Sequence, residues 1–270
     1  MWLPSGALTS TLLPKMKGML PSGMNRKVGR AMHDYEMLAD GDSILVAVSG
    51  GIDSLLLCWL LVLWEKKAPI SYRLQAIHVD MEGDADVPGR VARSISQVME
   101  SLELSLDVLP AAWKPGIEHQ KQGQSSKKDI CFQCARSRRT QLFAYARDHA
   151  FGKLALGHHR DDIIDTFFLN LTCAGNISTM RPKQELFSGH LSVIRPLAYC
   201  DKDEISLLGE KLGLVAIETE CPMAGHTRRQ EVHELVQSIY AHIPEAKEHI
   251  FAALGNVRQD YLLLPSSERQ

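Results

Sequence analysis

Short runs of apolar residues alternate with longer amphipathic stretches along most of this chain. Apolar runs of this length are typical of strands buried on both faces of a sheet, and the stretches between them are long enough for helices. Strands are predicted over residues 43–48, 72–80, 105–110, 153–157 and 192–194, with a further candidate at 214–217. Helices are predicted over residues 25–38, 53–66, 89–104, 131–150, 161–171 and 203–212, followed by a helical region over 228–254.

This alternation predicts an α/β fold, with a doubly wound, mostly parallel five-stranded sheet of Rossmann-like type and helices on both faces. Residues 1–23 carry several prolines and no sustained periodicity, so we expect a disordered extension there. An N-terminal helix over 24–40 precedes the main domain, residues 41–222, and a C-terminal helical region covers 223–270. Ligands of such sheets bind beyond the carboxyl ends of the strands.

Composition places the chain among ordinary globular proteins without a membrane segment. Hydrophobic residues make up 45% and charged residues 23% of the 270 residues. The longest apolar run, Leu55 to Trp64, is too short to cross a bilayer. The first residues lack the basic start and the cleavage site of a signal peptide. We therefore expect a cytoplasmic protein with no membrane partner.

Basic residues are clustered although the net charge is only −2. One cluster lies near the start of the chain and consists of Arg26, Lys27 and Arg30. A second lies between residues 127 and 139 and consists of Lys127, Lys128, Arg136, Arg138 and Arg139. Such clusters can hold phosphates on a protein that is not basic as a whole, and the alternative is a solvated face.

The first predicted strand runs directly into Ser49-Gly50-Gly51-Ile52-Asp53-Ser54, and a predicted helix follows at once. Two glycines let the backbone turn sharply, and the amides and dipole of the helix start favour an anion such as phosphate. Asp53 would repel phosphate unless a magnesium ion lies between them. The loop matches neither a Walker loop nor a dinucleotide fingerprint. It predicts a phosphate-binding loop of another kind, the alternative being a glycine turn that only joins strand to helix.

Six cysteines occur in a chain without an export signal, so a disulfide framework is not expected. Three of them are interpreted as ordinary core residues: Cys58, Cys173 and Cys200. Cys131 and Cys134 form a C-x-x-C pair, which indicates metal or redox chemistry. The spacing alone also fits a thiol redox pair or half of a zinc site. Three histidines are available as a fourth zinc ligand: His119, His226 and His233.

Two further stretches follow predicted strands and so should lie on the ligand edge of the sheet. The first is Gly157-His158-His159-Arg160-Asp161-Asp162, and the second is Ile194-Arg195-Pro196-Leu197. The two aspartates could act as helix caps, His158 as a packed core histidine and Arg195 as an ion-pair partner. Beside an anionic ligand at this edge, His158 would contact the ligand, and Arg160 and Arg195 would stabilise its negative charge.

The loop Ser-Gly-Gly-x-Asp-Ser resembles the PP-loop of the N-type ATP pyrophosphatases, which adenylate a carbonyl oxygen and release pyrophosphate. The C-x-x-C stretch, the Gly-His-His-Arg-Asp-Asp stretch and Ile-Arg-Pro-Leu resemble the tRNA 2-thiocytidine synthetase family, over about residues 24–260. The resemblance implies an ATP-dependent tRNA sulfurtransferase. In this activity, the C2 oxygen of a cytidine in the anticodon loop is adenylated, and sulfur from a 4Fe-4S cluster then replaces it.

The resemblance also implies which residues carry this chemistry. ATP and Mg²⁺ would be bound by Ser49, Gly50, Gly51, Asp53, Ser54, His78, Gly157 and His158. The cluster ligands would be Cys131, Cys134 and Cys221. The catalytic residues would be Asp53, Arg160, Asp161 and Arg195. tRNA phosphates would be held by the two basic clusters and by Lys183.

The implied partners are tRNA, ATP and a sulfur donor such as a cysteine desulfurase, and a homodimer is expected on the resemblance alone. Other functions stay open at this point. They are a 2-thiouridine synthase, a lysidine-type ligase, a non-enzymatic ATP-binding iron–sulfur or zinc protein, and a cluster-free sulfurtransferase with a persulfide on Cys131.

Overall fold

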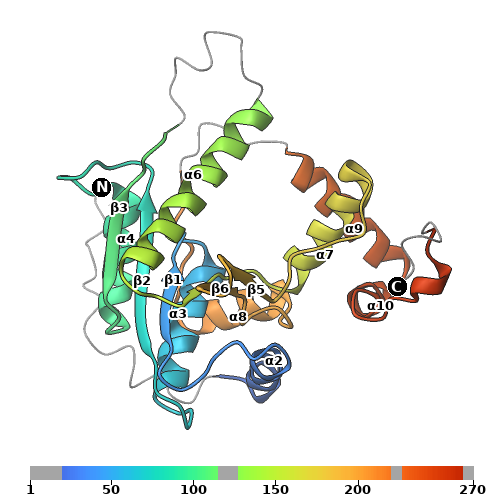
Figure 1. Ribbon diagram of the computed structural model, residues 1–270, viewed down its shortest axis with the longest axis horizontal. Coiled ribbons are helices and arrows are strands. Elements are labelled where there is room, and N and C mark those ends of the chain that lie inside the picture. Colours follow the sequence, from blue (N-terminus) through green and yellow to red (C-terminus); the bar gives the residue numbers. More distant parts are fainter. Residues whose placement is uncertain (1–19, 115–126, 220–226, 264–270) are drawn as a thin grey trace, which may run out of the picture. The chain divides into compact units, whose positions relative to one another are not determined.

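The computed structural model describes residues 20–114, 127–219 and 227–263 (Figure 1). The chain divides into two compact units. The first comprises Met1–Ile163 and Arg181–Gly225, and the second comprises Ile164–Met180 and His226–Gln270. The second unit therefore takes one short segment from the middle of the chain in addition to the C-terminal region.

The first unit is built on a six-stranded sheet in the order β3-β2-β1-β4-β6-β5. Its strands are β1 Ser43–Ala47, β2 Arg73–Asp80, β3 Leu106–Pro110, β4 Lys153–Ala155, β5 Lys183–Leu186 and β6 Leu191–Ile194. All neighbouring pairs are parallel except β5 and β6, which are antiparallel. The predicted mostly parallel α/β sheet is confirmed, with one strand more than the five expected.

The additional strand is β5, in a stretch that the sequence pattern left as irregular. Three of its four residues, Lys-Gln-Glu-Leu, are polar, and none is fully buried, because β5 is an edge strand that pairs with β6 alone. A polar edge strand has no apolar run by which it could be recognised. The candidate strand at 214–217 is not a strand. Instead, the Ile217 amide donates a 2.9 Å hydrogen bond to the Gly50 carbonyl and so supports the glycine loop.

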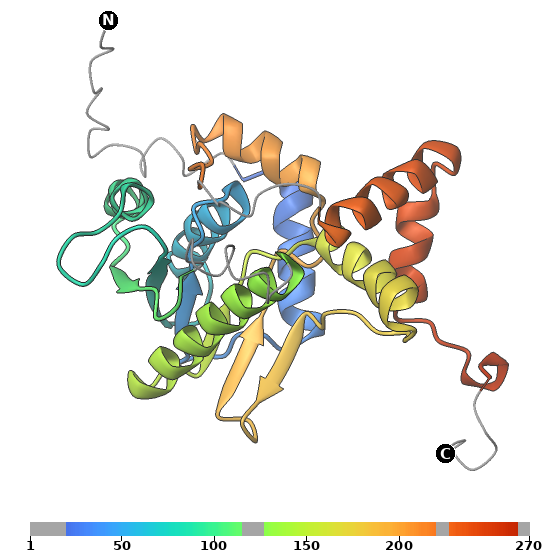
Figure 2. The same cartoon turned by 90° about the horizontal axis from the view of Figure 1, so that it is seen from above.

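Helices cover both faces of this sheet (Figure 2). Those of the first unit are α2 Ser22–Asp34, α3 Ile52–Glu65, α4 Arg90–Ser101, α6 Lys127–Asp148 and α8 Lys202–Lys211. Ile44 and Val46 of β1 face the core formed with α2, α3, α4 and α8, whereas Leu45 between them faces the core formed with α6. This alternation is the two-residue period of a strand that is buried on both faces.

Helix α3 is the centre of the larger core. Ten consecutive residues, Ser54 to Leu63, are buried, so the helix is apolar on every side. None of the helices in the described ranges is long and apolar enough to span a membrane. The helix predicted over residues 53–66 is confirmed, and its apolar run lies in the core.

The second unit is helical. Helix α7, Arg160–Leu169, enters it from the first unit and continues as a π-helical turn, Asn170–Ala174. Helices α9 Arg228–His242 and α10 Ala246–Ala253 complete the unit, followed by a 3-10 turn at Gln259–Tyr261. Ile164, Val232 and Val236 form its small buried core. Beside this core, His233 Nδ1 lies 2.8 Å from Asp165 Oδ2, so one nitrogen of that candidate zinc ligand is already occupied.

Candidate active site

The parallel strands bring their carboxyl ends to one edge of the sheet, and the predicted site residues follow these ends. The glycine loop follows β1, His78 and Asp80 end β2, Gly157 and His158 follow β4, and Arg195 follows β6. From β1 the chain runs outward through β2 to β3, and it then returns to form β4 on the other side of β1. The loop thus lies where the strand order reverses, which is the usual ligand position in such sheets.

The glycine loop is closed by its own serines. Ser54 Oγ donates to the Gly51 carbonyl at 2.8 Å, and the Ser49 amide lies 3.2 Å from Ser54 Oγ. Gly50 has φ +91°, a left-handed conformation that favours glycine. Gly51 then caps α3 in an extended conformation, while Ser49 is exposed and Asp53 is half-buried in the first helical turn. Amides at a helix start, with an open approach, fit a phosphate group.

Gly157 fixes the turn after β4 directly against this loop. A Cβ at Gly157 would lie 2.9 Å from the Asp53 carbonyl carbon and 3.0 Å from the Ser54 nitrogen, both backbone atoms. No side chain fits at this contact. The residue was predicted to bind the cofactor, and the structure shows that it keeps the β4 turn and the start of α3 in close contact.

At the end of β2, His78 and Asp80 are both buried. His78 Nδ1 lies 2.7 Å from the Val48 carbonyl and so carries the proton, which leaves Nε2 as a buried acceptor without a hydrogen-bond partner in the described structure. Burial lowers the pKa of His78, and the positive charge of Arg138 on α6 acts in the same direction. Asp80 accepts backbone hydrogen bonds from Glu82, Gly83 and Gly89 and so closes the following loop. An orphaned acceptor at the ligand edge fits a group that donates a hydrogen bond, such as the amino group of an adenine.

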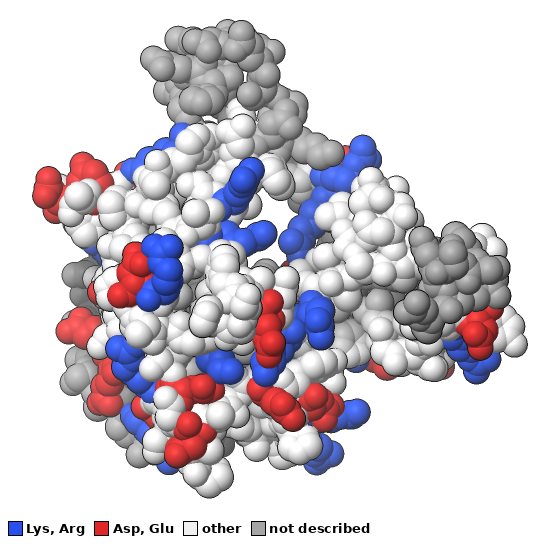
Figure 3. Space-filling model, viewed as in Figure 1, with Lys and Arg blue, Asp and Glu red and all other residues white. Residues whose placement is uncertain are grey.

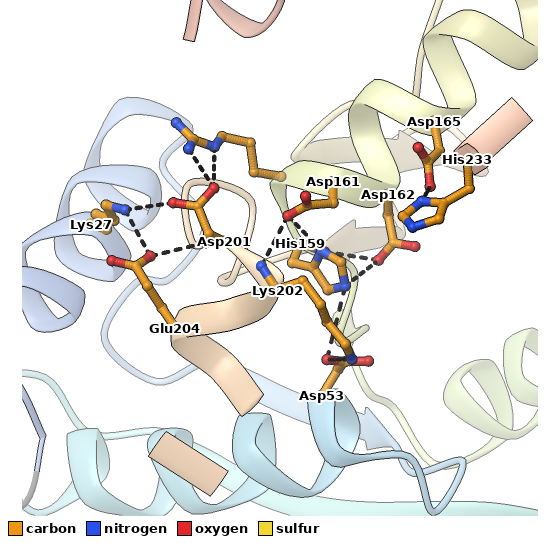
Figure 4. Close-up of polar contacts among 11 residues, drawn as sticks. Lys27, Asp53, His159, Asp161, Asp162, Asp165, Asp201, Lys202, Glu204 and His233 are labelled. Carbon is orange, nitrogen blue, oxygen red and sulfur yellow. Dashed lines mark hydrogen bonds and ion pairs between the residues drawn. The ribbon is translucent and has the colours of Figure 1, made fainter. Parts of the chain in front are cut away.

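His159, which the sequence pattern did not single out, lies at the centre of an acidic cluster (Figure 4). Its side chain is 8% exposed. Nε2 lies 3.3 Å from Asp162 Oδ2 and 3.9 Å from Asp53 Oδ1, and Nδ1 lies 3.6 Å from Asp161 Oδ2. The imidazole thus separates three carboxylates that would repel one another. In the sequence, His159 is marked only by its place beside His158. That place does not show which of the two histidine side chains is buried.

Asp161 and Arg160 position the start of α8. Asp161 accepts a 2.9 Å hydrogen bond from the Lys202 amide, and Arg160 Nε donates to Asp201 Oδ1 at 2.7 Å. The Lys27 ammonium lies 3.0 Å from Asp201 and 2.7 Å from Glu204. Arg160 and Lys27, predicted as a catalytic and an RNA-binding residue, are therefore engaged in internal ion pairs that join α2, α7 and α8.

Lys202 was also absent from the predicted site. Its ammonium lies 2.6 Å from Asp53 Oδ1, so it reaches from the first residue of α8 to the first turn of α3. The sequence gives no sign of this contact, because the two residues are 149 positions apart.

Arg195 is buried beside His158. Its Nε lies 3.3 Å from His158 Nδ1, and its NH1 group donates to the Arg181 carbonyl. Burial and the neighbouring charge of Arg139 lower the pKa of Arg195 to about 10. The guanidinium is therefore still charged at neutral pH and can stabilise an anion. Lys183 lies on β5, where its ammonium bonds the Glu36 carbonyl at 3.1 Å.

Cys131 and Cys134 lie one turn apart on α6, and both thiols are half-buried. Since α6 leads into β4, it runs antiparallel to the strands and begins near their carboxyl ends. Thiolates at such a spacing and exposure fit a metal or cluster ligand set. The third predicted ligand, Cys221, lies outside the described residues, as do His119 and His226. The described residues alone contain no group of three metal ligands.

The basic residues of α6 lie on the same side of the sheet as the cysteines. Arg136, Arg138 and Arg139 are exposed, and Figure 3 shows lysine and arginine side chains over the α6 region of the face it presents. The side chains of Lys127 and Lys128 lie outside the described residues. On α2, Arg26 and Arg30 are exposed, and Arg30 Nε lies 3.3 Å from Asp34.

This fold, with a serine–glycine phosphate loop after β1, defines a PP-loop ATP-binding protein. A family model described as a PP-loop domain matches residues 21–221. Within that class, the chain belongs to the tRNA-cytidine(32) 2-sulfurtransferase family. It is 34% identical over 242 residues to the family member of Dichelobacter nodosus, and the match covers 89% of this chain and 88% of the relative.

Other comparisons agree with this assignment. The tRNA-cytidine(32) 2-sulfurtransferase of Xanthomonas euvesicatoria is 34% identical over 245 residues, covering 88% of this chain and 76% of the relative. The structure is similar to the U34-tRNA thiolase NcsA from Methanococcus maripaludis with its [4Fe-4S] cluster. That similarity has a TM-score of 0.67 at 21% identity and covers 93% of this chain and 80% of NcsA, so it supports the fold.

Proposed function

We propose that this protein is an ATP-dependent sulfurtransferase that converts a cytidine of tRNA to 2-thiocytidine. The observation that carries the proposal is that one unit holds both a PP-loop at the carboxyl edge of the sheet and a half-buried C-x-x-C pair near the same edge. The relatives' shared name supplies the target, position 32 of the anticodon loop. A loop base is accessible to such a site because it can leave the stack.

The PP-loop would bind the phosphates of ATP through its amides and the hydroxyl of Ser49, with Asp53 as the ligand of Mg²⁺. Adenylation forms a bond between the C2 oxygen of cytidine and the α-phosphorus and releases pyrophosphate. A sulfur nucleophile then forms the C2–S bond, and the oxygen departs with AMP. Arg195, buried and charged beside His158, is suited to stabilise the negative charge that develops on the phosphate.

Cys131, Cys134 and Cys221 would hold a 4Fe-4S cluster, which supplies an iron without a protein ligand for the sulfur atom. Arg138 and Arg139 lie close enough to influence His78 and Arg195, so they belong to the rim of the site as well as to the basic surface. We propose that this rim holds the tRNA backbone beside the bound ATP. A cysteine desulfurase-type donor would supply the sulfur, and a homodimer would be the assembled form.

The test is a thiolation assay with anaerobically purified protein, ATP, Mg²⁺, a sulfide source and tRNA lacking 2-thiocytidine. We expect a brown protein with about four irons per chain, pyrophosphate release and 2-thiocytidine in the digested tRNA. The Cys131→Ser variant should lose iron and product. The matched control is Cys173→Ser. Cys173 was interpreted as a core residue, but that interpretation is wrong, because Cys173 is exposed on the π-helical turn of the second unit.

Other outcomes identify the alternatives. A lysine-modified cytidine formed without iron would indicate a lysidine-type ligase. Formation of 2-thiouridine would indicate a 2-thiouridine synthase. Stoichiometric zinc with no pyrophosphate release from any tRNA would overturn the proposed function. Product formation that needs Cys131 but no iron would indicate a persulfide mechanism.

A further inference from the structure

The ammonium of Lys202 lies directly against Asp53, the predicted ligand of Mg²⁺. It lies 2.6 Å from Asp53 Oδ1, and both side chains are accessible, with 41% of the Lys202 side chain and 27% of the Asp53 side chain exposed (Figure 4). A divalent cation bound to Asp53 would lie close to the Lys202 ammonium, and the two positive charges would repel each other. Binding of Mg²⁺ by Asp53 therefore favours a position of the Lys202 side chain away from Asp53.

The backbone of Lys202, in contrast, is firmly held. Its amide donates to Asp161 at 2.9 Å, and the preceding residue, Asp201, is bound by Arg160 and Lys27. The root of the side chain is thus fixed at the start of α8, while four flexible methylene groups carry the ammonium. A charge on such a stem can exchange one partner for another within reach without any movement of the helix.

We propose that Lys202 is a phosphate-binding residue that exchanges Asp53 for the polyphosphate of ATP when Mg²⁺ binds to Asp53. This assignment rests on the proposed function, because it takes ATP and Mg²⁺ as the ligands of the PP-loop. Without ligand, Lys202 neutralises Asp53 next to the neighbouring carboxylate of Asp162. With ligand, the metal takes over that task, and the ammonium becomes available to the phosphates, for which lysine is a usual partner.

The proposal predicts effects of opposite sign in the variant Lys202→Gln. The variant should bind Mn²⁺ alone more tightly, about 2- to 5-fold, because a competing partly exposed ion pair is removed. It should bind ATP with Mg²⁺ about 10-fold more weakly, because a charge-assisted contact to phosphate is lost. If the ion pair had a purely structural role, its loss would weaken the binding of Mn²⁺ and the binding of ATP together.

The experiment titrates the full chain with Mn²⁺, followed by electron paramagnetic resonance, and with ATP in the presence of Mg²⁺, followed by calorimetry. Lys202→Arg, which keeps the charge, should retain most of the ATP affinity. Lys211→Gln, an exposed lysine at the other end of α8, should leave both affinities unchanged.

Circular dichroism and thermal melting establish that the Lys202→Gln variant is folded. If this folded variant binds Mn²⁺ and ATP like the wild type, or binds both more weakly, the assignment of Lys202 is wrong while the proposed function stands. If the wild type binds no ATP, the proposed function is wrong and the assignment of Lys202 is wrong with it.

Discussion

The contact of Gly157 with the start of α3 leads to a quantitative prediction for the variant Gly157→Ala. The added methyl group would lie 2.9–3.0 Å from backbone atoms of Asp53 and Ser54, where ordinary contacts begin at 3.4 Å. The two segments would have to separate by about 0.5 Å, and backbone cannot yield as a flexible side chain does. Overpacking of this kind costs about 1–3 kcal/mol. Since the shifted atoms belong to the phosphate loop, ATP affinity should fall together with stability.

The assay combines denaturant unfolding with ATP titration, and Gly152→Ala is the matched control. Gly152 lies just before the same strand, has no positive φ, and has open space where the methyl group of an alanine would lie, with no neighbouring atom within 4 Å. The control should therefore stay within about 0.5 kcal/mol of the wild type. For Gly157→Ala we expect a melting temperature lower by roughly 2–10 °C. Equal stability and equal ATP affinity in the two variants would refute the view that this contact fixes the loop.

Three further predictions concern the loop, its neighbouring strand and the basic surface. Ser54→Ala removes the hydroxyl that bonds Gly51, so calorimetry should show ATP binding weaker by about 3- to 10-fold. Burial opposes the charge of Asp80, but its three backbone hydrogen bonds outweigh burial and lower its pKa below 3.8. Their stabilisation is present above pH 3.8 and lost as the pH falls through the lower folded pKa. Asp80→Asn should therefore destabilise by about 1–3 kcal/mol at pH 7 in denaturant unfolding, and this difference should shrink below about pH 4. Arg138→Ala combined with Arg139→Ala should weaken tRNA binding in filter-binding assays. The slope of the logarithm of the binding constant against the logarithm of the salt concentration should fall by about 2 in magnitude. An unchanged slope would contradict a role of these two residues in tRNA binding.

The sequence carried the information for the phosphate loop because that feature is local. Strand, glycine turn and helix are contiguous from Ser43 to Glu65, and each has its own signal in the residue pattern. The edge strand β5 could not be found in this way, because its polar residues are paired on one side only. The helix starts were placed within a few residues, except that α6 begins at Lys127, earlier than the predicted residue 131.

The candidate site was predictable only where a residue follows a strand. Gly157 and Arg195 could be assigned to the ligand edge by that rule, but Lys202 could not, because it begins a helix. Its contact with Asp53 depends on how α8 packs against α3, and on Asp161, which holds the Lys202 amide. Such a contact is a property of tertiary structure, and no spacing within the sequence predicts it.

Tertiary contacts also divide the basic residues, which look alike in the sequence, into two kinds. Lys27 and Arg160 share Asp201 and so join segments that lie up to 174 residues apart. Arg138 and Arg139 remain exposed, and their charges act on His78 and Arg195 at the ligand edge. A tRNA phosphate that approaches Lys27 would have to compete with two carboxylates already within 3.0 Å. One that approaches α6 would meet exposed guanidinium groups whose charges reach the ligand edge of the sheet. The α6 cluster is therefore the surface on which substitutions should weaken tRNA binding while leaving the fold intact, whereas substitution of Lys27 should first affect the position of α8 and, through it, Lys202.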